Sequence, residues 1–367
     1  MINKKVGILT WHYYLNFGSA LQSFALSNVI NSLGYDTVFV NYRDPKLCYI
    51  PNSILSKLKA VVRYVLAHIP VLGKRWHINI NTIKFRNRYL DETVPFNSEE
   101  EGVGICRDLS TICCGSDQIW APNCYNPYYF AHFLDGRKVR KISYAASIGL
   151  NDIPENLAKV YRQHLLDFYA VSVREKEGSE LLKSRCNIDS TVVLDPTLLV
   201  DVSVYEKMQR KVHGIHKPFI FCYFLNKEHQ YKQTVERYAR EHNLQIVGVS
   251  DKASDTEWMK RLTGLGADHF LWLINNAEII MTDSYHGSIF SLLFHKNLWI
   301  FQRFEESNPI CQNSRIRQLR NNFNIGQRII MATSPIDDSK TIDYNYFESR
   351  LKELRASSLD FLKKTLE

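Results

Sequence analysis

Apolar residues along this chain fall into short continuous runs separated by stretches with helical spacing. The runs of the first half cover residues 6–10, 37–41, 111–114, 141–145, 170–173 and 191–194. Between the first two runs, residues 20–33 repeat apolar positions at helical spacing, and Gly34 then provides a typical helix cap. A strand, a helix and a strand of these lengths predict a parallel sheet with a right-handed crossover.

The second half of the chain repeats this alternation. Its apolar runs cover residues 219–224, 245–249, 279–282 and 298–301, and helical patterns cover residues 230–242 and 344–364. We therefore predict an α/β protein with two Rossmann-like domains in a glycosyltransferase-B-like arrangement with an interdomain cleft. The expected domains are residues 1–212, residues 213–340 and a C-terminal helix at 341–367 that packs back on the first domain. Ligands should bind at the carboxyl ends of the strands.

Composition fits this architecture and limits the chemistry. The chain has 367 residues, of which 45% are apolar and 23% charged, enough for two α/β cores. None of its eight cysteines forms a CxxC pair, and the first residues lead directly into an apolar run. We expect a cytoplasmic protein with reduced thiols. No His or Cys spacing suggests a metal site, so we predict no metal and no cofactor.

Positive charge is concentrated in one segment. Residues 46–90 contain nine lysines and arginines and no Asp or Glu, against a net charge of +8 for the whole chain. Nucleic-acid motifs are absent, so we expect no nucleic-acid partner. Apolar positions in residues 54–69 form one helical stripe, with Lys57, Lys59 and Arg63 among them. This pattern predicts a peripheral helix on an anionic membrane surface, at the inner face. The alternative is a stripe that packs on the N-terminal domain.

A turn at residues 282–288 joins an apolar run to an apolar helix. Ser284, His286 and Gly287 lie where the helix begins, and a helix N-terminus attracts phosphate or carboxylate. The imidazole of His286 could transfer a proton near neutral pH. The alternative is a simple helix cap with an incidental histidine.

Two further strand ends are followed by candidate ligand-binding residues. Arg174 follows the run at 170–173, and its planar fork suits a carboxylate or phosphate. Ser116, Asp117 and Gln118 follow the run at 111–114 together with a tryptophan, a combination that suits a sugar. The alternatives are a surface arginine paired with a neighbouring glutamate, and an aspartate helix cap beside a core tryptophan.

Two loops offer weaker candidates. Asn16 and Gly18 follow the first run and could hold a ligand through backbone N–H groups, but they match no dinucleotide or triphosphate motif. Arg303, Arg315 and Arg317 flank a loop after a late strand, where most arginines are simply solvated.

Together these segments resemble the polysaccharide pyruvyl transferases. The resemblance spans about residues 5–328. It rests on WHYYLNFGSALQSFAL, GSDQIWAP, KISYAASIG, VSVREKEG, VVLDPTLL, DSYHGSIFSLLF and NSRIRQL, which occur in the family's order and approximate spacing. Some members have Arg-Leu-His where this chain has Ser284-Tyr285-His286. We expect Arg315 or Arg303 to supply the charge of the missing arginine.

The resemblance implies transfer of a pyruvyl group from phosphoenolpyruvate to a sugar as a cyclic ketal, with release of phosphate. It assigns residues 213–340 to the donor, bound by Arg174, Ser284, His286, Gly287, Arg303 and Arg315. It assigns residues 1–212 to a saccharide acceptor. One version of the hypothesis has a lipid-linked acceptor. The residues expected to bind it are Asn16, Gly18, Ser116, Asp117 and Gln118. His286 would be the acid, Asp117 would orient or deprotonate the acceptor, and Arg174 would complete the catalytic set.

Two other functions fit the same pattern. One is a glycosyltransferase that uses a nucleotide sugar, because a shared fold does not fix function. The other is a non-catalytic assembly protein that binds glycan and membrane.

Overall fold

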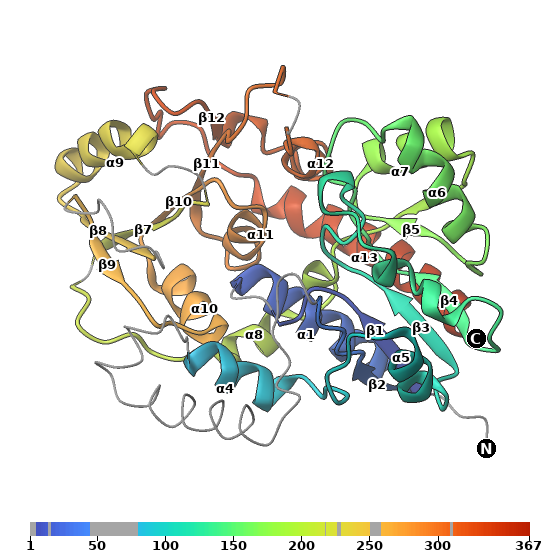
Figure 1. Cartoon of the computed structure of the whole chain (residues 1–367). Coiled ribbons are helices and arrows are strands. Elements are labelled where there is room, and N and C mark those ends of the chain that lie inside the picture. The colour runs from blue at the N-terminus through green and yellow to red at the C-terminus, as the bar shows by residue number, and fades with distance from the viewer. Residues whose placement is uncertain are drawn as a thin grey trace. The chain divides into compact units, whose positions relative to one another are not determined.

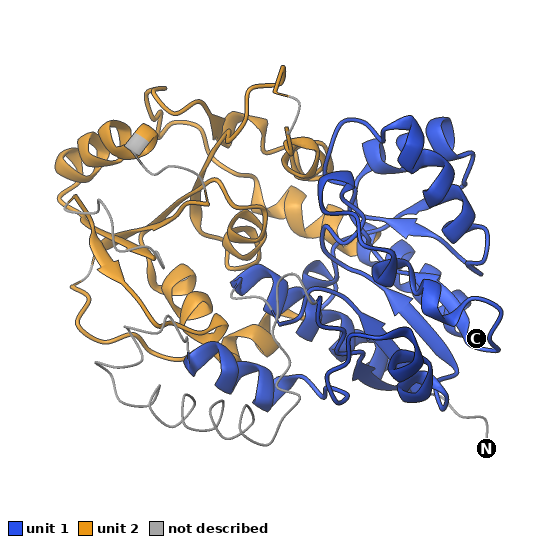
Figure 2. Ribbon diagram, in the orientation of Figure 1, with its two compact units in different colours: residues 1–200, 354–367 blue, residues 201–353 orange. Residues whose placement is uncertain are grey.

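The computed structural model describes residues 5–13, 16–44, 80–216, 218–225, 229–249, 258–308 and 311–367 (Figure 1). The chain divides into two compact units (Figure 2). Unit 1 comprises Met1–Val200 and Leu354–Glu367, and unit 2 comprises Asp201–Glu353. The predicted membrane helix at residues 54–69, and the basic segment up to residue 79, lie outside the described residues, so that hypothesis stays a prediction.

Unit 1 is built on a parallel sheet in the order β2-β1-β3-β4. Its strands are β1 (Lys5–Leu9), β2 (Asp36–Phe39), β3 (Thr111–Cys114) and β4 (Arg140–Ser143). A short parallel pair consists of β5 (Ser172–Val173) and β6 (Thr191–Val192). Isolated β-bridges, between Ile142 and Ala170 and between Ala146 and Val173, connect this pair to β4 and the loop after it. All four residues of β3 are buried, and the last three, Ile112, Cys113 and Cys114, are apolar, as expected for a parallel sheet covered by helices.

Helices follow most strands of unit 1. Asn16 caps α1 (Phe17–Ser32), because its side chain accepts a hydrogen bond from the Ser19 backbone N–H at 3.1 Å. The other helices are α4 (Ile80–Tyr89), α5 (Glu99–Cys106), α6 (Glu155–Leu165), α7 (Lys176–Cys186) and the 3-10 turns η1 (Pro122–Cys124), η2 (Pro127–Phe130), η3 (His132–Leu134) and η4 (Pro196–Leu198). Helices α6 and α7 pack side by side (Figure 1).

Unit 2 is a second parallel sheet, in the order β12-β11-β10-β7-β8-β9. Its strands are β7 (Phe219–Tyr223), β8 (Gln245–Val249), β9 (Lys260–Leu262), β10 (Ile279–Thr282), β11 (Asn297–Phe301) and β12 (Ile329–Ile330). Its helices are α8 (Val202–Met208), α9 (His229–Glu241), α10 (Ala267–Asn276), α11 (Tyr285–Leu293), α12 (Ser314–Phe323) and the turn η5 (Gly326–Arg328). The strand–helix–strand order makes this unit Rossmann-like, as unit 1 is.

The boundaries of the two units differ from those expected from the sequence, which lay after residues 212 and 340. Unit 2 already begins at Asp201, because α8 packs on α10 and the Arg210 backbone N–H donates to the Asp268 carbonyl at 3.1 Å. The last helix, α13 (Tyr344–Leu366), starts in unit 2 and joins unit 1 from Leu354 onward. There the hydroxyl of Ser358 accepts a hydrogen bond from the Leu194 backbone N–H at 3.0 Å. An unbroken helical pattern does not reveal where a helix passes from one unit to the other.

The described residues include neither a membrane-spanning helix nor a cluster of metal ligands. None of the helices there has the length and apolar character needed to cross a membrane. No group of three or more His, Cys, Asp or Glu side chains in that part of the chain is arranged to hold a metal ion.

Candidate functional site

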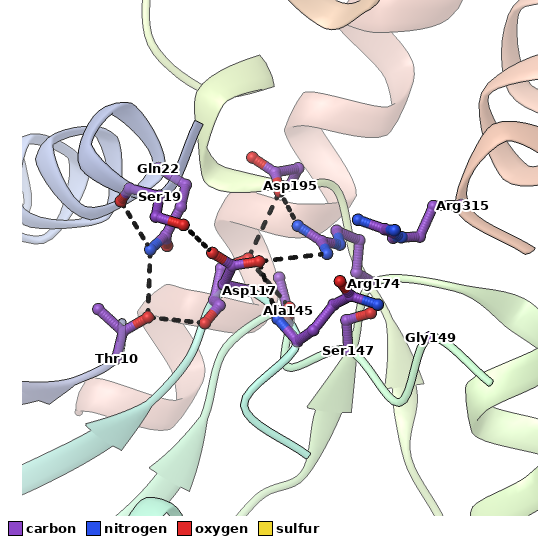
Figure 3. Close-up of polar contacts among 12 residues, drawn as sticks. Thr10, Ser19, Gln22, Asp117, Ala145, Ser147, Gly149, Arg174, Asp195 and Arg315 are labelled. Atoms are coloured by element: carbon purple, nitrogen blue, oxygen red, sulfur yellow. Dashed lines mark hydrogen bonds and ion pairs between the residues drawn. The ribbon is translucent and has the colours of Figure 1, made fainter. Parts of the chain in front are cut away.

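The carboxyl edge of the unit 1 sheet gathers polar side chains from several loops (Figure 3). Thr10 follows β1 and donates its hydroxyl to the Ser116 carbonyl at 2.8 Å, which ties the first loop to the loop after β3. The Ser116 hydroxyl donates to the Ala145 carbonyl at 3.0 Å, which ties in the loop after β4. Gly115 makes this close approach possible, because its φ is +127° and a Cβ there would lie 2.1 Å from the Tyr144 oxygen.

Arg174 is the centre of this cluster. Its side chain is buried, and its Nη1 donates to Asp195 Oδ2 at 2.6 Å. Asp117 Oδ1 lies 3.9 Å from Nη2, and Glu175 Oε2 lies 3.9 Å from Nε. These described side chains place three carboxylates around one guanidinium. Among these side chains carboxylates outnumber guanidinium groups, and the guanidinium of Arg174 is already engaged.

Asp117 is oriented by contacts from both sides. Its Oδ2 accepts a hydrogen bond from the Ser19 hydroxyl at 2.6 Å, and its Oδ1 accepts one from the Gln118 backbone N–H at 2.9 Å. Ser19 lies in the first turn of α1, two residues after Phe17 begins the helix. The backbone of Asp117 has a φ of +74°, a left-handed conformation that is uncommon for a residue other than glycine. Such constrained residues cluster at functional sites.

Glu175 and Asp195 fix the loops that carry them. Glu175 Oε1 accepts three hydrogen bonds, from the Ser147 hydroxyl at 2.8 Å and from the backbone N–H groups of Ile148 and Gly149 at 2.9 Å each. Asp195 Oδ1 accepts from both the N–H and the hydroxyl of Thr197. Both carboxylates therefore serve as fixed anchors for the site.

The predicted acceptor residues are brought together here in part. Ser116 and Asp117 belong to the cluster, and Asp117 reaches α1 through Ser19. Asn16 caps α1, and Gly18 is buried in the first turn of that helix, so both shape the loop through the backbone. Among the described residues, the side-chain Nε2 of Gln118 has no hydrogen-bond acceptor.

In unit 2 the candidate site is the turn from β10 into α11. The Ser284 hydroxyl caps α11 by accepting a hydrogen bond from the Gly287 N–H at 3.2 Å, as a helix cap should. A Cβ at Gly287 would lie 2.7 Å from the Thr282 hydroxyl, so packing within the turn itself requires glycine. His286 lies in the first turn of α11 and is 6% exposed. The structure therefore shows a capped helix start that carries a buried histidine, and a role for His286 stays a prediction.

Two arginines of unit 2 converge on one amide. Arg303, after β11, and Arg315, in the first turn of α12, each donate to the side-chain oxygen of Gln312 at 3.0 Å. The Arg315 guanidinium also lies 5.6 Å from the ring centre of Tyr285, the first residue of α11. Like charges held so close raise the local positive potential. The third candidate, Arg317, pairs with Glu306 at 2.6 Å.

Several important partners were not predicted. Ser19, Asp195 and Gln312 anchor the candidate residues, and Asp283 accepts hydrogen bonds from the Leu225 N–H at 2.7 Å and the Tyr231 hydroxyl at 3.1 Å. A signal for Asp195 was present, because it follows an apolar run in the segment VVLDPTLL. The pairing itself depends on which loops the sheet order brings together.

A separate buried network lies at the ends of β1 and β2. The His12 Nδ1 lies 3.0 Å from the Thr10 carbonyl, and its Nε2 lies 3.9 Å from Glu92 Oε2. Burial, opposed by the nearby Glu92 carboxylate, lowers the pKa of His12 to about 4. Burial would raise the pKa of Glu92, but hydrogen bonds from Arg86 and the charges of His12, Arg86 and Arg43 hold it below its ordinary value.

This network should make the protein sensitive to mild acid. The unfolded chain binds a proton at His12 near pH 6.5 and the folded chain only near pH 4, so the free energy of unfolding should fall as pH drops across this window. The full contribution of His12 to the free energy of unfolding is about 3 kcal/mol. Urea unfolding of His12→Asn should show a smaller loss between pH 7 and pH 5 than the unchanged protein. Equal losses in both would contradict the assignment.

Comparison with known proteins identifies a family for the chain. A family model for polysaccharide pyruvyl transferase matches residues 16–302 of the chain. No curated protein matches the sequence significantly.

Solved structures define the fold class. A UDP-GlcNAc 2-epimerase from Neisseria meningitidis, solved with UDP-GlcNAc, is 9% identical, with 99% of each chain covered and a TM-score of 0.51. The S. aureus MnaA–UDP structure is 12% identical, covering 96% of this chain and 88% of that one, with a TM-score of 0.51. The wall teichoic acid polymerase TagF is 8% identical, covering 99% and 88%, with a TM-score of 0.52. These similarities confirm the predicted fold, two Rossmann-like domains of the glycosyltransferase-B type. With its model matching most of the sequence, this chain belongs to the polysaccharide pyruvyl transferase family.

Proposed function

We propose that this protein transfers a pyruvyl group from phosphoenolpyruvate to two hydroxyls of a sugar in a surface-polysaccharide precursor. The observation that carries the proposal is the convergence of Arg303 and Arg315 on Gln312, beside the start of α11, in a chain of this family. Two guanidinium groups on one neutral amide favour an anionic ligand between or beside them. Phosphoenolpyruvate carries both a phosphate and a carboxylate.

Unit 2 is therefore the proposed donor side. Arg315 and Arg303 would bind the anionic groups, and the N-terminus of α11, capped by Ser284, would add the positive end of its dipole. Arg303 and Arg315 would thus supply the charge that, by the resemblance, an arginine at position 284 provides in some members. His286 lies in the same turn and would act on the bound donor.

Unit 1 is the proposed acceptor side. Its cluster holds three carboxylates against one guanidinium, and such a set accepts hydrogen bonds from sugar hydroxyls more readily than it binds a dianion. Asp117, fixed by Ser19, would bind or deprotonate the attacking hydroxyl. Arg174 would position Asp117 and Asp195. Direct contact of Arg174 with the donor remains a prediction.

The chemistry needs one acid and one base. A proton from His286 is added to the methylene carbon of phosphoenolpyruvate, which becomes a methyl group, while one sugar hydroxyl attacks the neighbouring carbon and loses its proton toward Asp117. The second hydroxyl then attacks the same carbon, the bond to the phosphate oxygen breaks, and phosphate leaves with the proton of that hydroxyl. Proton exchange with water then returns Asp117 to the carboxylate and His286 to its protonated form. Proton transfer of this kind accelerates a reaction by about 10²–10⁴-fold.

A donor assay separates this function from the alternatives. We expect phosphate release from phosphoenolpyruvate that depends on added saccharide acceptor. Turnover of a nucleotide sugar would instead indicate a glycosyltransferase. Turnover of neither, with glycan still bound, would indicate an assembly protein.

Arg315→Gln should weaken use of the donor. A hydrogen bond to a charged group contributes about 1.5–3 kcal/mol, so the Michaelis constant for phosphoenolpyruvate should rise about 10- to 100-fold. The matched control is Arg320→Gln on the exposed side of the same helix, α12. If both variants had the same constant as the unchanged protein, the donor site would lie elsewhere.

Asp117→Asn should affect the acceptor instead. The amide keeps the shape of the side chain but loses the charge that binds a hydroxyl, so the acceptor Michaelis constant should rise about tenfold or turnover should fall. Affinity for phosphoenolpyruvate, measured by calorimetry, should stay within a few-fold of the original. A loss of donor affinity with unchanged acceptor kinetics would move Asp117 to the donor side.

A further inference from the structure

A cavity of about 720 Å³ opens at the amino ends of the unit 2 strands. Its wall includes Pro218 just before β7, Ile279 at the start of β10 and Asn297 at the start of β11. The proposed donor residues follow β10 and β11 and therefore lie at the opposite, carboxyl edge of the sheet. The cavity is thus separate from the proposed donor site, and its volume lies within the range of small-molecule sites.

The deepest cation of this cavity is Arg328. Its side chain is 5% exposed, its Nη1 donates to Asn297 Oδ1 at 2.9 Å, and its guanidinium lies 4.5 Å from the ring centre of Trp299. Within the described residues, Arg328 Nε has no hydrogen-bond acceptor. Burial lowers the pKa of Arg328 despite the nearby acidic groups. A buried guanidinium with an unused donor favours an oxyanion.

The rim of the cavity has the opposite character. Asp338 accepts a hydrogen bond from the Tyr238 hydroxyl at 2.9 Å and lies 3.1 Å from His242 Nε2, and its side chain is 45% exposed. Glu278 is exposed at the same cavity. Tyr238 and His242 are stacked with their ring centres 3.9 Å apart, which gives the rim a rigid aromatic surface. Carboxylates beside an aromatic surface suit a hydroxylated ring.

We propose that this cavity binds a phosphorylated monosaccharide. The phosphate would contact Arg328 and the ammonium group of Lys296, which also lines the cavity. The sugar hydroxyls would donate to Asp338 and Glu278, and the apolar face of the ring would lie against Tyr238. An inorganic anion alone would not reach the rim carboxylates, and a neutral sugar would leave Arg328 Nε without an acceptor. The proposal does not depend on pyruvyl transfer, because none of these residues belongs to the proposed active site.

Calorimetry with glucose 6-phosphate as the probe tests the proposal. We expect saturable binding that weakens at least tenfold in Arg328→Gln and several-fold in Asp338→Asn. Glucose and inorganic phosphate should each bind much more weakly than the phosphorylated sugar. Arg315→Gln is the matched control for a cation at the other edge of unit 2, and it should retain binding.

Each other outcome would overturn the proposal. Absence of binding, binding unchanged in Arg328→Gln, or equal affinity for inorganic phosphate would exclude a sugar phosphate site here. If Arg328→Gln failed to fold, the affinities of Arg328→Lys and Asp338→Asn for glucose 6-phosphate would test the proposal instead. Affinities equal to that of the unchanged protein would overturn it. Phosphate release from phosphoenolpyruvate in Arg328→Gln should match that of the unchanged protein, which separates this site from the proposed transferase function.

Discussion

Replacing Arg174 by methionine should lower the free energy of unfolding by about 3–5 kcal/mol, since removing one partner of a buried ion pair strands the other. The carboxylate of Asp195 is fully buried and lies 2.6 Å from Arg174 Nη1. Asp117 and Glu175 lie within 4 Å of the same guanidinium. Methionine keeps most of the side-chain volume, so the expected loss reflects charge rather than a cavity. Urea unfolding measures it directly.

Arg185→Met is the matched control for this experiment. Arg185 pairs with Asp152 at 2.7 Å, but both side chains are more than half exposed. An exposed pair contributes about 0–1 kcal/mol, so this variant should be nearly as stable as the unchanged protein. A similar small effect in both variants would show that the Arg174 cluster is not a structural centre of unit 1.

Much of the fold could be predicted because parallel strands buried on both faces appear as continuous apolar runs. The strands at Thr111–Cys114, Gln245–Val249 and Ile279–Thr282 have the bounds expected from the sequence. Strand β9, with the sequence KRL, was missed because two of its three residues are charged. Strand β12 has only two residues, too few to form a pattern.

The positions of the candidate residues could also be predicted, since a strand end is visible in the sequence. Their partners could not. Arg174 was expected to point into an open cleft or to pair with a neighbouring glutamate. It instead donates a hydrogen bond to Asp195, which follows β6, and Glu175 lies farther away at 3.9 Å. That pairing arises from the adjacency of β5 and β6, and neither run reveals which strand lies beside it. The same limit applies to Gln312, which becomes important only when two arginines meet on it.

The two candidate sites differ in charge, and this difference favours binding of the donor and the acceptor by different units. The cluster in unit 1 holds more carboxylates than cations, whereas the turn and loop of unit 2 bring Arg303 and Arg315 together. An anionic donor and a hydroxylated acceptor have opposite requirements. Charge alone therefore favours the donor on unit 2 and the acceptor on unit 1.

His286→Gln should lower turnover about 10²–10⁴-fold, the range expected when a general acid is removed. Glutamine retains a polar side chain of similar reach but cannot donate a proton to carbon. Because Arg303 and Arg315 remain, affinity for phosphoenolpyruvate by calorimetry should change only a few-fold. The loss should therefore appear in kcat and in kcat/KM to the same extent, as for an interaction made only in the transition state.

His295→Gln provides the control, because it changes a histidine just beyond the end of the same helix. His295 is nearly half exposed and lies 2.8 Å from Glu348 Oε1, away from the turn at the start of α11. Its turnover should equal that of the unchanged protein. Full activity of His286→Gln with both substrates saturating would remove His286 from the reaction. The turn before α11 would then be a helix cap that helps to bind the donor, and the proton would have to come from another group.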